Sequence, residues 1–350
     1  MAFALSIANR VLFVGLIGLP ASGCGKSTDT AKQRGRVVVY SSLDREFSEP
    51  VLKDFERRTG VRVDAKYDVE STKTVGLTQL IAAESQTGRT RCDLFWNNEI
   101  LNTLRLKKQG LLRPFHPKNA DDYPQAFRDK DGTWYGFAAR ARILLVNTKL
   151  VPESKRPKGI RDLLDPRWKD KVGMAKPLFG TTATHAACLF SAWGNEKATQ
   201  YFRGLKANGL NILSGNKQVA TAVGSGELAV GLTDTDDAMG EIAAGNPVVI
   251  VYPDRDAEGL GTLYIPNTLA ILKGAPDVEA AEDLANELLS PEVETILAQG
   301  PSAQIPLNPK VSQAAQVESP KSVKAMVVDW EATVGLWDEV MVFLASEFAG

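Results

Sequence analysis

Histidine and cysteine are scarce in this sequence, and its positive and negative charges nearly balance. It contains two histidines, His116 and His185, which are too few for a zinc site built on imidazole ligands. After Cys24 only Cys92 and Cys188 remain, each in an apolar run, and we expect two buried thiols in preference to a disulfide. With 41 basic and 42 acidic residues the formal net charge is −1, so charge alone predicts no nucleic-acid partner and no anionic membrane partner.

Two motifs that would indicate an enzyme are incomplete or missing. No G-x-S-x-G hydrolase motif occurs. The segment Gly25-Lys26-Ser27 matches the second half of a phosphate-binding loop, but the first glycine of that loop falls on Pro20. Proline has a fixed φ and no N–H, so it cannot form the permissive turn. We therefore predict no enzyme activity and no catalytic cofactor.

The N-terminal segment predicts export. Residues 1–10 end on a positive charge and contain no acid, and residues 11–19 are an apolar run too short to span a bilayer. Small residues then precede Cys24, an order that resembles a bacterial lipoprotein signal. We predict a signal peptide over residues 1–23, lipidation of Cys24 and a polar tether over residues 24–35, with ordinary secretion as the alternative.

Beyond the tether the sequence predicts an α/β fold, because strand-like and helix-like segments alternate. The remaining residues, about 315, are enough for two lobes. Short apolar or alternating runs predict strands over residues 37–40, 61–67, 92–96, 142–147, 172–175, 228–233, 248–252 and 261–265. Helical spacing predicts helices over residues 43–59, 73–85, 100–109, 181–193, 195–208, 218–226, 278–289 and 292–299, with an amphipathic tail over 323–348.

Polar side chains follow the predicted strands, where α/β sheets bind ligands and helix starts present free N–H groups. These strand-end residues are Ser41, Ser42, Asp44, Asn97, Glu99, Thr181, Thr182, Asp234, Thr235, Asp236 and Asp237. The densest group is Asp234, Asp236 and Asp237, whose like charges repel unless a cation is present. Hard cations accept such oxygen ligands. The alternative is a solvated turn before a helix at Ala238, with the acids favoured by the helix dipole.

Two arginines and two threonines could hold an anion. Arg140 and Arg142 are two residues apart at the start of a predicted strand, so both face one side of it. They fit either a bidentate clamp on an anion or an ion pair between lobes. Thr181 and Thr182 open a predicted helix, where they would cradle an anion or simply cap the helix.

Seven segments together carry a family resemblance. They are VVVYSS at 37–42, RRTG at 57–60, DLFWNNE at 93–99, QGLLRP at 109–114, DPRWK at 165–169, GELA at 226–229 and PLNP at 306–309. In this order they resemble the ferric-ion-binding solute receptors of bacterial ABC importers, over residues 36–310. The resemblance implies a type II periplasmic-binding-protein fold with a β-strand hinge. Lobe one would comprise residues 36–140 and 258–310, and lobe two residues 141–257 and 311–350.

The resemblance also implies a ligand site. Glu99 stands where the family has a glutamate ligand, and Asp44 stands where it often has a histidine. The family's adjacent tyrosine pair is replaced by acids at Asp236 and Asp237, or by Thr235 with Asp236. Carboxylates in place of phenolates keep a hard, anionic site that is less selective for iron. The family's co-bound anion corresponds to the helix start at Thr181 and Thr182, near Asn216.

These observations predict a periplasmic or cell-surface solute-binding lipoprotein of an ABC importer. It would be a monomer with a permease as its partner and a lipid anchor in the membrane. The predicted ligand is ferric iron or a divalent metal, with a co-bound anion. The metal ligands would be Asp44, Glu99, Asp234, Asp236 and Asp237, and the other contacts Ser41, Ser42, Asn97, Arg140, Arg142, Thr181, Thr182, Asn216 and Thr235. The alternatives are a receptor for a polyamine or an aminophosphonate, whose amine the acids would hold, and an exported metal-dependent hydrolase, which turnover would reveal.

Overall fold

The computed structural model describes residues 35–68 and 75–349. Residues Gln33–Gly350 form one compact unit. Within the described ranges, no helix combines the length and the apolar character needed to cross a bilayer. The predicted signal peptide, Cys24 and all but the last residue of the predicted tether lie outside the described residues.

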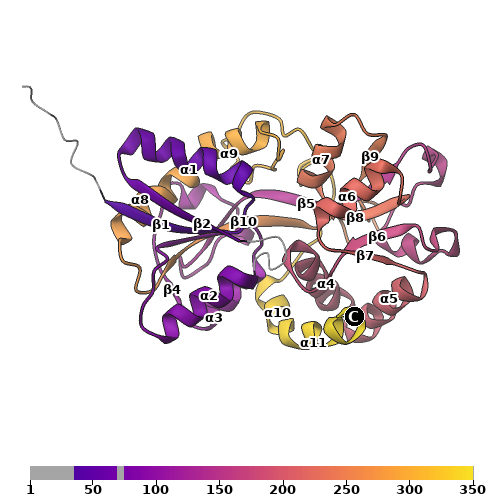
Figure 1. Cartoon of the computed structure of the whole chain (residues 1–350), viewed down its shortest axis with the longest axis horizontal. Coiled ribbons are helices and arrows are strands. Elements are labelled where there is room, and N and C mark those ends of the chain that lie inside the picture. Colours follow the sequence, from indigo (N-terminus) through magenta and orange to yellow (C-terminus); the bar gives the residue numbers. More distant parts are fainter. Residues whose placement is uncertain (1–34, 69–74, 350) are drawn as a thin grey trace, which may run out of the picture. The chain divides into compact units, whose positions relative to one another are not determined.

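The strands pair in the order β2-β1-β3-β10-β5-β8-β6-β7, with β4 beside β10 and β9 beside β5 (Figure 1). The first half of this sheet consists of β1 (Arg36–Ser41), β2 (Arg62–Tyr67), β3 (Leu94–Asn97), β4 (Leu112–Arg113), β10 (Tyr264–Leu272) and residues 135–141 of β5 (Tyr135–Asn147). The second half consists of residues 142–147 of β5 with β6 (Val172–Ala175), β7 (Asn211–Leu213), β8 (Val230–Asp234) and β9 (Val248–Val251). The strand β5 therefore passes from one half to the other between Ala141 and Arg142.

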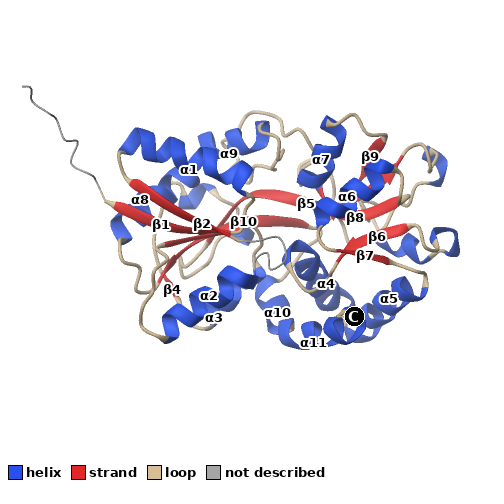
Figure 2. Ribbon diagram, in the orientation of Figure 1, coloured by secondary structure: helices blue, strands red, loops and turns tan. Residues whose placement is uncertain are grey.

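Helices flank both halves of the sheet (Figure 2). The first half carries α1 (Arg45–Thr59), α2 (Val75–Gln86), α3 (Leu101–Lys108), α8 (Val278–Leu288) and α9 (Pro291–Gln299). The second half carries α4 (Gly180–Trp193), α5 (Asn195–Ala207), α6 (Asn216–Ser225) and α7 (Thr235–Ala243). Two C-terminal helices, α10 (Trp330–Gly335) and α11 (Trp337–Phe348), follow, and α10 packs against both α3 and α4. Short 3-10 helices lie at Ala120–Asp122, Gln125–Phe127, Glu153–Lys155, Ile160–Leu164 and Pro166–Trp168.

Local sequence signals explain where several helices begin and end. Val51, Leu52 and Phe55 form the buried face of α1, which ends at Gly60 with a left-handed φ of 74°. The side chain of Asp277 caps α8 by accepting a hydrogen bond from the backbone of Ala280. The helices α1, α4 and α7 follow β1, β6 and β8, so the polar residues after these strands lie at or near helix starts.

Several local predictions were wrong. The strand predicted over residues 261–265 is β10, which spans Tyr264–Leu272. The strand β5 is about twice as long as the predicted 142–147 run, because two arginines interrupt its apolar pattern while pairing with β10 extends it. The helix α7 begins at Thr235 and not at Ala238, so Asp236 and Asp237 belong to its first turn. The predicted solvated turn is wrong as well, since Asp234 is 2% and Asp236 8% exposed. The two thiols Cys92 and Cys188 are free and buried, as expected.

Candidate functional site

A cavity of about 290 Å³ lies where strand ends and helix starts from both halves of the sheet meet. In the described part of the chain, four helices begin at its wall: α1, α4, α6 and α7. Its lining consists of Asp44, Arg45, Glu46, Asn98, Arg140, Gly180, Thr181, Asn216, Lys217, Asp234, Asp236 and Asp237. The free N–H groups and the dipoles of these helix starts favour negative charge inside the cavity.

Arg142 does not line the cavity itself but contacts residues that form one of its walls. It lies on β5 directly opposite Asp234 of β8, and its side chain has no solvent exposure. Its Nη1 lies 2.8 Å from Asp234 Oδ1, 3.1 Å from Asn216 Oδ1 and 3.3 Å from Thr181 Oγ1. A buried guanidinium needs such partners, because water cannot solvate it. Arg142 is therefore committed to the protein itself and does not line the cavity.

Asp234 connects the starts of α4 and α6 to the end of β8. Its Oδ2 accepts hydrogen bonds from Thr181 Oγ1 at 2.5 Å and from Asn216 Nδ2 at 3.0 Å. Thr182 Oγ1 adds a bond of 3.1 Å to Asn216 Oδ1. With Arg142 on its other oxygen, this carboxylate accepts bonds from three side chains, which fixes its position.

Of the two arginines on β5, Arg140 faces the cavity. Its Nη1 lies 3.5 Å from Asp236 Oδ2, and both side chains are almost fully buried. Its Nε and Nη2 are buried without a hydrogen-bond partner. Burial lowers the pKa of Arg140, but the carboxylates of Asp236, Asp234, Asp44 and Asp237 outweigh it and hold the pKa above its usual value. Arg140 is thus a fixed cation with two nitrogens whose N–H groups lack a hydrogen-bond acceptor.

The acidic cluster Asp234, Asp236 and Asp237 could hold a metal ion. Each residue offers one carboxylate oxygen, and these atoms all lie within 4.8 Å of one another. Asp44 lines the same cavity from the start of α1, in the first half of the sheet. Five acidic and three basic side chains line the cavity, which gives a formal charge of −2. The cavity therefore favours a hard cation, or a ligand that carries positive charge next to an anionic group.

The cavity also has a charged pair at the two helix starts that face each other. Lys217 Nζ of α6 lies 3.6 Å from Glu46 Oε1 of α1, and both side chains are exposed. This pair joins the two halves of the sheet at the wall of the cavity.

Comparison with known proteins identifies the family. A family model described as bacterial extracellular solute-binding protein matches residues 101–334. The chain belongs to the bacterial extracellular solute-binding protein family. The proteins of this family bind solutes for transport and are not catalysts, in agreement with the prediction of no enzyme activity, and they act outside the cytoplasm. The hydrolase alternative is therefore not retained.

Individual relatives of this solute-binding protein cover most of the chain. Iron uptake protein A1 of Synechocystis sp. is 25% identical over 340 residues, 91% of this chain and 89% of that protein. A putative 2-aminoethylphosphonate-binding periplasmic protein of Salmonella typhi is 25% identical over 232 residues, 65% of this chain and 67% of that protein. The structure of iron-bound HitA from Pseudomonas aeruginosa superposes with a TM-score of 0.79 at 23% identity, over 89% of this chain and 98% of HitA. This likeness confirms the predicted type II periplasmic-binding-protein fold.

Seven of the residues that the sequence predicted to contact the ligand of this solute-binding protein line the cavity. Asp44, Arg140, Thr181, Asn216, Asp234, Asp236 and Asp237 all line it. The lining residues that were not predicted are Arg45, Glu46, Asn98, Gly180 and Lys217. All of these lie within two positions of a residue that was predicted. For Arg45, Glu46, Gly180 and Lys217 the signal was the first helical turn, whose side chains also reach the strand ends, and Asn98 directly follows the end of β3.

Seven predicted residues do not line the cavity: Ser41, Ser42, Asn97, Glu99, Arg142, Thr182 and Thr235. Thr235 Oγ1 accepts a hydrogen bond of 3.1 Å from the backbone of Ala141, and Ser41 Oγ donates one of 3.3 Å to the carbonyl of Leu43. Asn97 Nδ2 donates to Glu99 Oε1 and to Thr103 Oγ1, while Ser42 Oγ is buried. Thr235, Ser41 and Asn97 therefore stabilise the protein's own turns, whereas the Ser42 hydroxyl has no hydrogen-bond partner.

Of these seven residues, Glu99 bears most on the predicted set of metal ligands. It has no solvent exposure, and its oxygens accept hydrogen bonds from within the protein. Burial raises its pKa, which the hydrogen bonds from Thr184, Asn102, Asn97 and Leu101 oppose without cancelling. The resemblance implied a metal ligand at this position, but in the structure Glu99 does not line the cavity.

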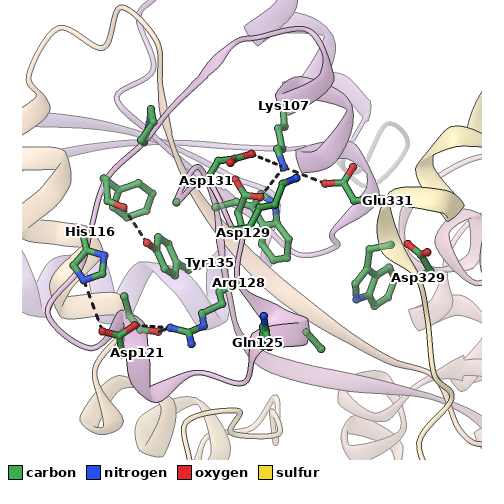
Figure 3. A pocket seen from close by; sticks show the side chains of 18 of the residues that line it. Lys107, His116, Asp121, Gln125, Arg128, Asp129, Asp131, Tyr135, Asp329 and Glu331 are labelled. Carbon is green, nitrogen blue, oxygen red and sulfur yellow. Dashed lines mark hydrogen bonds and ion pairs between the residues drawn. The ribbon is translucent and has the colours of Figure 1, made fainter.

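A second, larger cavity of about 1260 Å³ lies around Lys107, beside the start of α10 (Figure 3). Several of its charged groups pair with one another. Lys107 Nζ contacts Asp129 at 2.6 Å and Glu331 at 3.1 Å, and Arg128 Nη1 contacts Asp121 at 2.6 Å. Because no end of β1, β3 or β8 reaches the lining of this larger cavity, we assign the binding site to the smaller cavity.

Proposed function

We propose that this solute-binding protein is the receptor of an ABC importer and captures a metal cation, ferric or divalent, together with an anion. The observation that carries the proposal is the pairing of opposite charges in one cavity. One carboxylate oxygen from each of the three residues of the acidic cluster lies within 4.8 Å of the other two, next to an arginine with two buried nitrogens that have no hydrogen-bond partner. The name of its relative, iron uptake protein A1, supports iron as the cation.

The cation would bind to Asp236 and Asp237 of α7 and to Asp44 of α1. Asp234 is engaged by Arg142, Thr181 and Asn216, so it would orient the site and contribute at most a shared oxygen. Carboxylate oxygens suit ferric and divalent hard cations, and the net charge of the lining favours them further. Glu99 is left out of the ligand set, because it lies outside the cavity.

The anion would bind to Arg140 and to the start of α4. Arg140 Nε and Nη2 are buried without a partner and need acceptor oxygens. Thr181 lines the cavity in the first turn of α4, so backbone N–H groups are available beside its hydroxyl. An oxyanion shared between Arg140 and the metal would satisfy both groups and neutralise part of the metal's charge.

Binding would be coupled to closure of two lobes that move about β5 and β10. In this proposal lobe one comprises residues 36–140 and 258–310, and lobe two residues 141–257 and 311–350. Asp44 then comes from lobe one and the acidic cluster from lobe two, so only the closed form completes the ligand set. A permease would distinguish loaded from empty receptor by this shape, and Cys24 would anchor the receptor to the membrane through lipid.

The test is elemental analysis and native mass spectrometry of the protein purified without chelators, compared with Asp236→Asn. We expect stoichiometric iron or another metal in the wild type and its loss in Asp236→Asn, because the variant removes a charged ligand. Asp283→Asn, on the exposed face of α8, is the matched control and should retain the metal. A wild-type protein that remains metal-free after incubation with ferric citrate, and after incubation with divalent ions, would refute the proposal.

A second candidate function is a receptor for an aminophosphonate. It is favoured by the same pairing of Arg140 with the acidic cluster, which suits a phosphonate and an amine on one molecule. The similarity to a putative 2-aminoethylphosphonate-binding periplasmic protein supports it. In the same mass spectrum this function predicts a bound small molecule and no metal.

A further inference from the structure

Glu99 is held at the start of α3 by donors of its own half of the sheet. It lies in the turn between β3 and α3, and its side chain is fully buried. Its Oε1 accepts hydrogen bonds from the backbone N–H of Asn102 at 3.0 Å and from Asn97 Nδ2 at 3.2 Å. Its Oε2 accepts one from the backbone N–H of Leu101 at 2.7 Å. The carboxylate thus satisfies two free N–H groups of the first turn of α3.

The fourth donor to Glu99 comes from the other half of the sheet. Thr184 Oγ1 donates to Glu99 Oε2 at 2.8 Å, and Thr184 has no solvent exposure. Thr184 lies on α4, the helix that follows β6, whereas Glu99 follows β3. Because both groups are buried, solvent does not weaken this hydrogen bond. The helix α10 packs against both α3 and α4, beside this contact.

We infer that Glu99 is a positioning residue and not a ligand: its hydrogen bond to Thr184 holds α3 on α4 and sets how the two halves of the sheet face each other across the cavity. A carboxylate has about four acceptor positions, and the four donors occupy all of them. A metal ion could bind Glu99 only if some of these hydrogen bonds were broken.

The same helix carries the contact and part of the cavity wall. Thr181 and Thr184 are three residues apart on α4, which places them about one turn apart on the same face. A displacement of Thr184 therefore moves Thr181, which lines the cavity and donates a hydrogen bond to Asp234. Loss of the Glu99–Thr184 bond should loosen the arrangement of the two halves without removing any proposed ligand atom.

The first experiment measures the arrangement of the two halves without ligand. Spin labels at Lys53→Cys on α1 and Ala243→Cys on α7, both exposed positions, report the distance between them by electron double resonance. The background carries Cys24→Ser, and the two remaining native thiols are buried. Relative to the doubly labelled protein that retains Thr184, Thr184→Val should shift the distances between the two labels to longer values. Thr184→Ser, which keeps the hydroxyl, should give the same label distances as Thr184.

The second experiment measures affinity for iron supplied as ferric citrate, and this part rests on the proposed function. Thr184→Val should weaken binding about tenfold, the effect of one hydrogen bond to a charged group, with unchanged stoichiometry. The matched control is Glu294→Gln. Glu294 is also fully buried and accepts three backbone N–H bonds, but it links α9 to β5 and to residues 307–308. This control should change neither the distances nor the affinity.

The outcomes separate this inference from the proposed function. If Thr184→Val keeps the wild-type distances, the inference is overturned whether or not the protein binds metal. If the wild type binds no metal but Thr184→Val lengthens the distances, the inference stands and the metal proposal does not. If Glu99→Gln abolishes iron binding while Thr184→Val leaves distances and affinity unchanged, Glu99 is a ligand and the inference is wrong.

Discussion

The buried pair of Arg142 and Asp234 predicts a large, specific loss of stability. Replacing Arg142 by Met keeps a long, flexible side chain on β5 but leaves the carboxylate of Asp234 without its cation. The two charged atoms lie 2.8 Å apart, and the side chains are 0% and 3% exposed. Breaking such a pair from one side costs about 3–5 kcal/mol, because the remaining charge stays desolvated. This is a large part of the free energy of unfolding of a typical domain.

The assay is urea unfolding followed by circular dichroism, with the unfolding free energy compared among variants. Arg142→Met should lower it by about 3–5 kcal/mol. The double variant Arg142→Met/Asp234→Asn should recover a large part of that loss, because it removes the orphaned charge. As a control, Arg113→Met breaks an exposed pair with Glu282 at 3.8 Å and should cost less than about 1 kcal/mol. An Arg142→Met protein as stable as the Arg113→Met control would refute the reasoning.

Two further predictions concern pH and backbone space. Burial raises the pKa of Glu294 above the usual glutamate value of 4.5, so this residue stabilises the fold below about pH 4.5 and loses that contribution as pH rises through the raised pKa. Glu294→Gln should therefore flatten the dependence of the unfolding free energy on pH across this window, measured by urea titrations at several pH values. Gly261 has a φ of 91°, and a Cβ there would lie 2.5 Å from the backbone of Ala325, so Gly261→Ala should cost at least about 1–3 kcal/mol in thermal unfolding. Gly240 lies in α7 with open space around it, so Gly240→Ala should instead raise the free energy of unfolding by about 0.5–1 kcal/mol. Equal melting temperatures for Gly261→Ala and Gly240→Ala would contradict this reasoning.

The candidate site could be located from the sequence because its residues obey a local rule. Polar residues that follow apolar strands lie at helix starts, and in an α/β sheet these meet at one edge. Asp44, Thr181 and the acidic cluster, which this rule selects, all line the cavity. It did not separate residues whose side chains turn into the cavity from neighbours that hold a turn together, such as Thr235 and Asn97.

The two arginines show what pattern alone could not resolve. Arg140 and Arg142 share one face of β5, so the sequence predicted a common role for them. Their neighbours differ, because β5 passes from one half of the sheet to the other between them: Arg140 lies opposite Ile265 of β10, and Arg142 lies opposite Asp234 of β8. The cross-strand acid neutralises Arg142 inside the protein, whereas Arg140 is left to face the cavity.

The sequence by itself therefore determined the α/β class, most of the strands and helices, and the resemblance to a binding-protein family, because these depend on apolar periodicity, capping residues and motifs within short segments. Only the tertiary structure decided the roles of single charged groups. Whether Glu99, Arg142 and Asp234 are available to a ligand depends on partners up to 92 residues away in the chain. A buried charge is stabilised by whichever group the strand register and helix packing bring beside it, and no local pattern specifies that group.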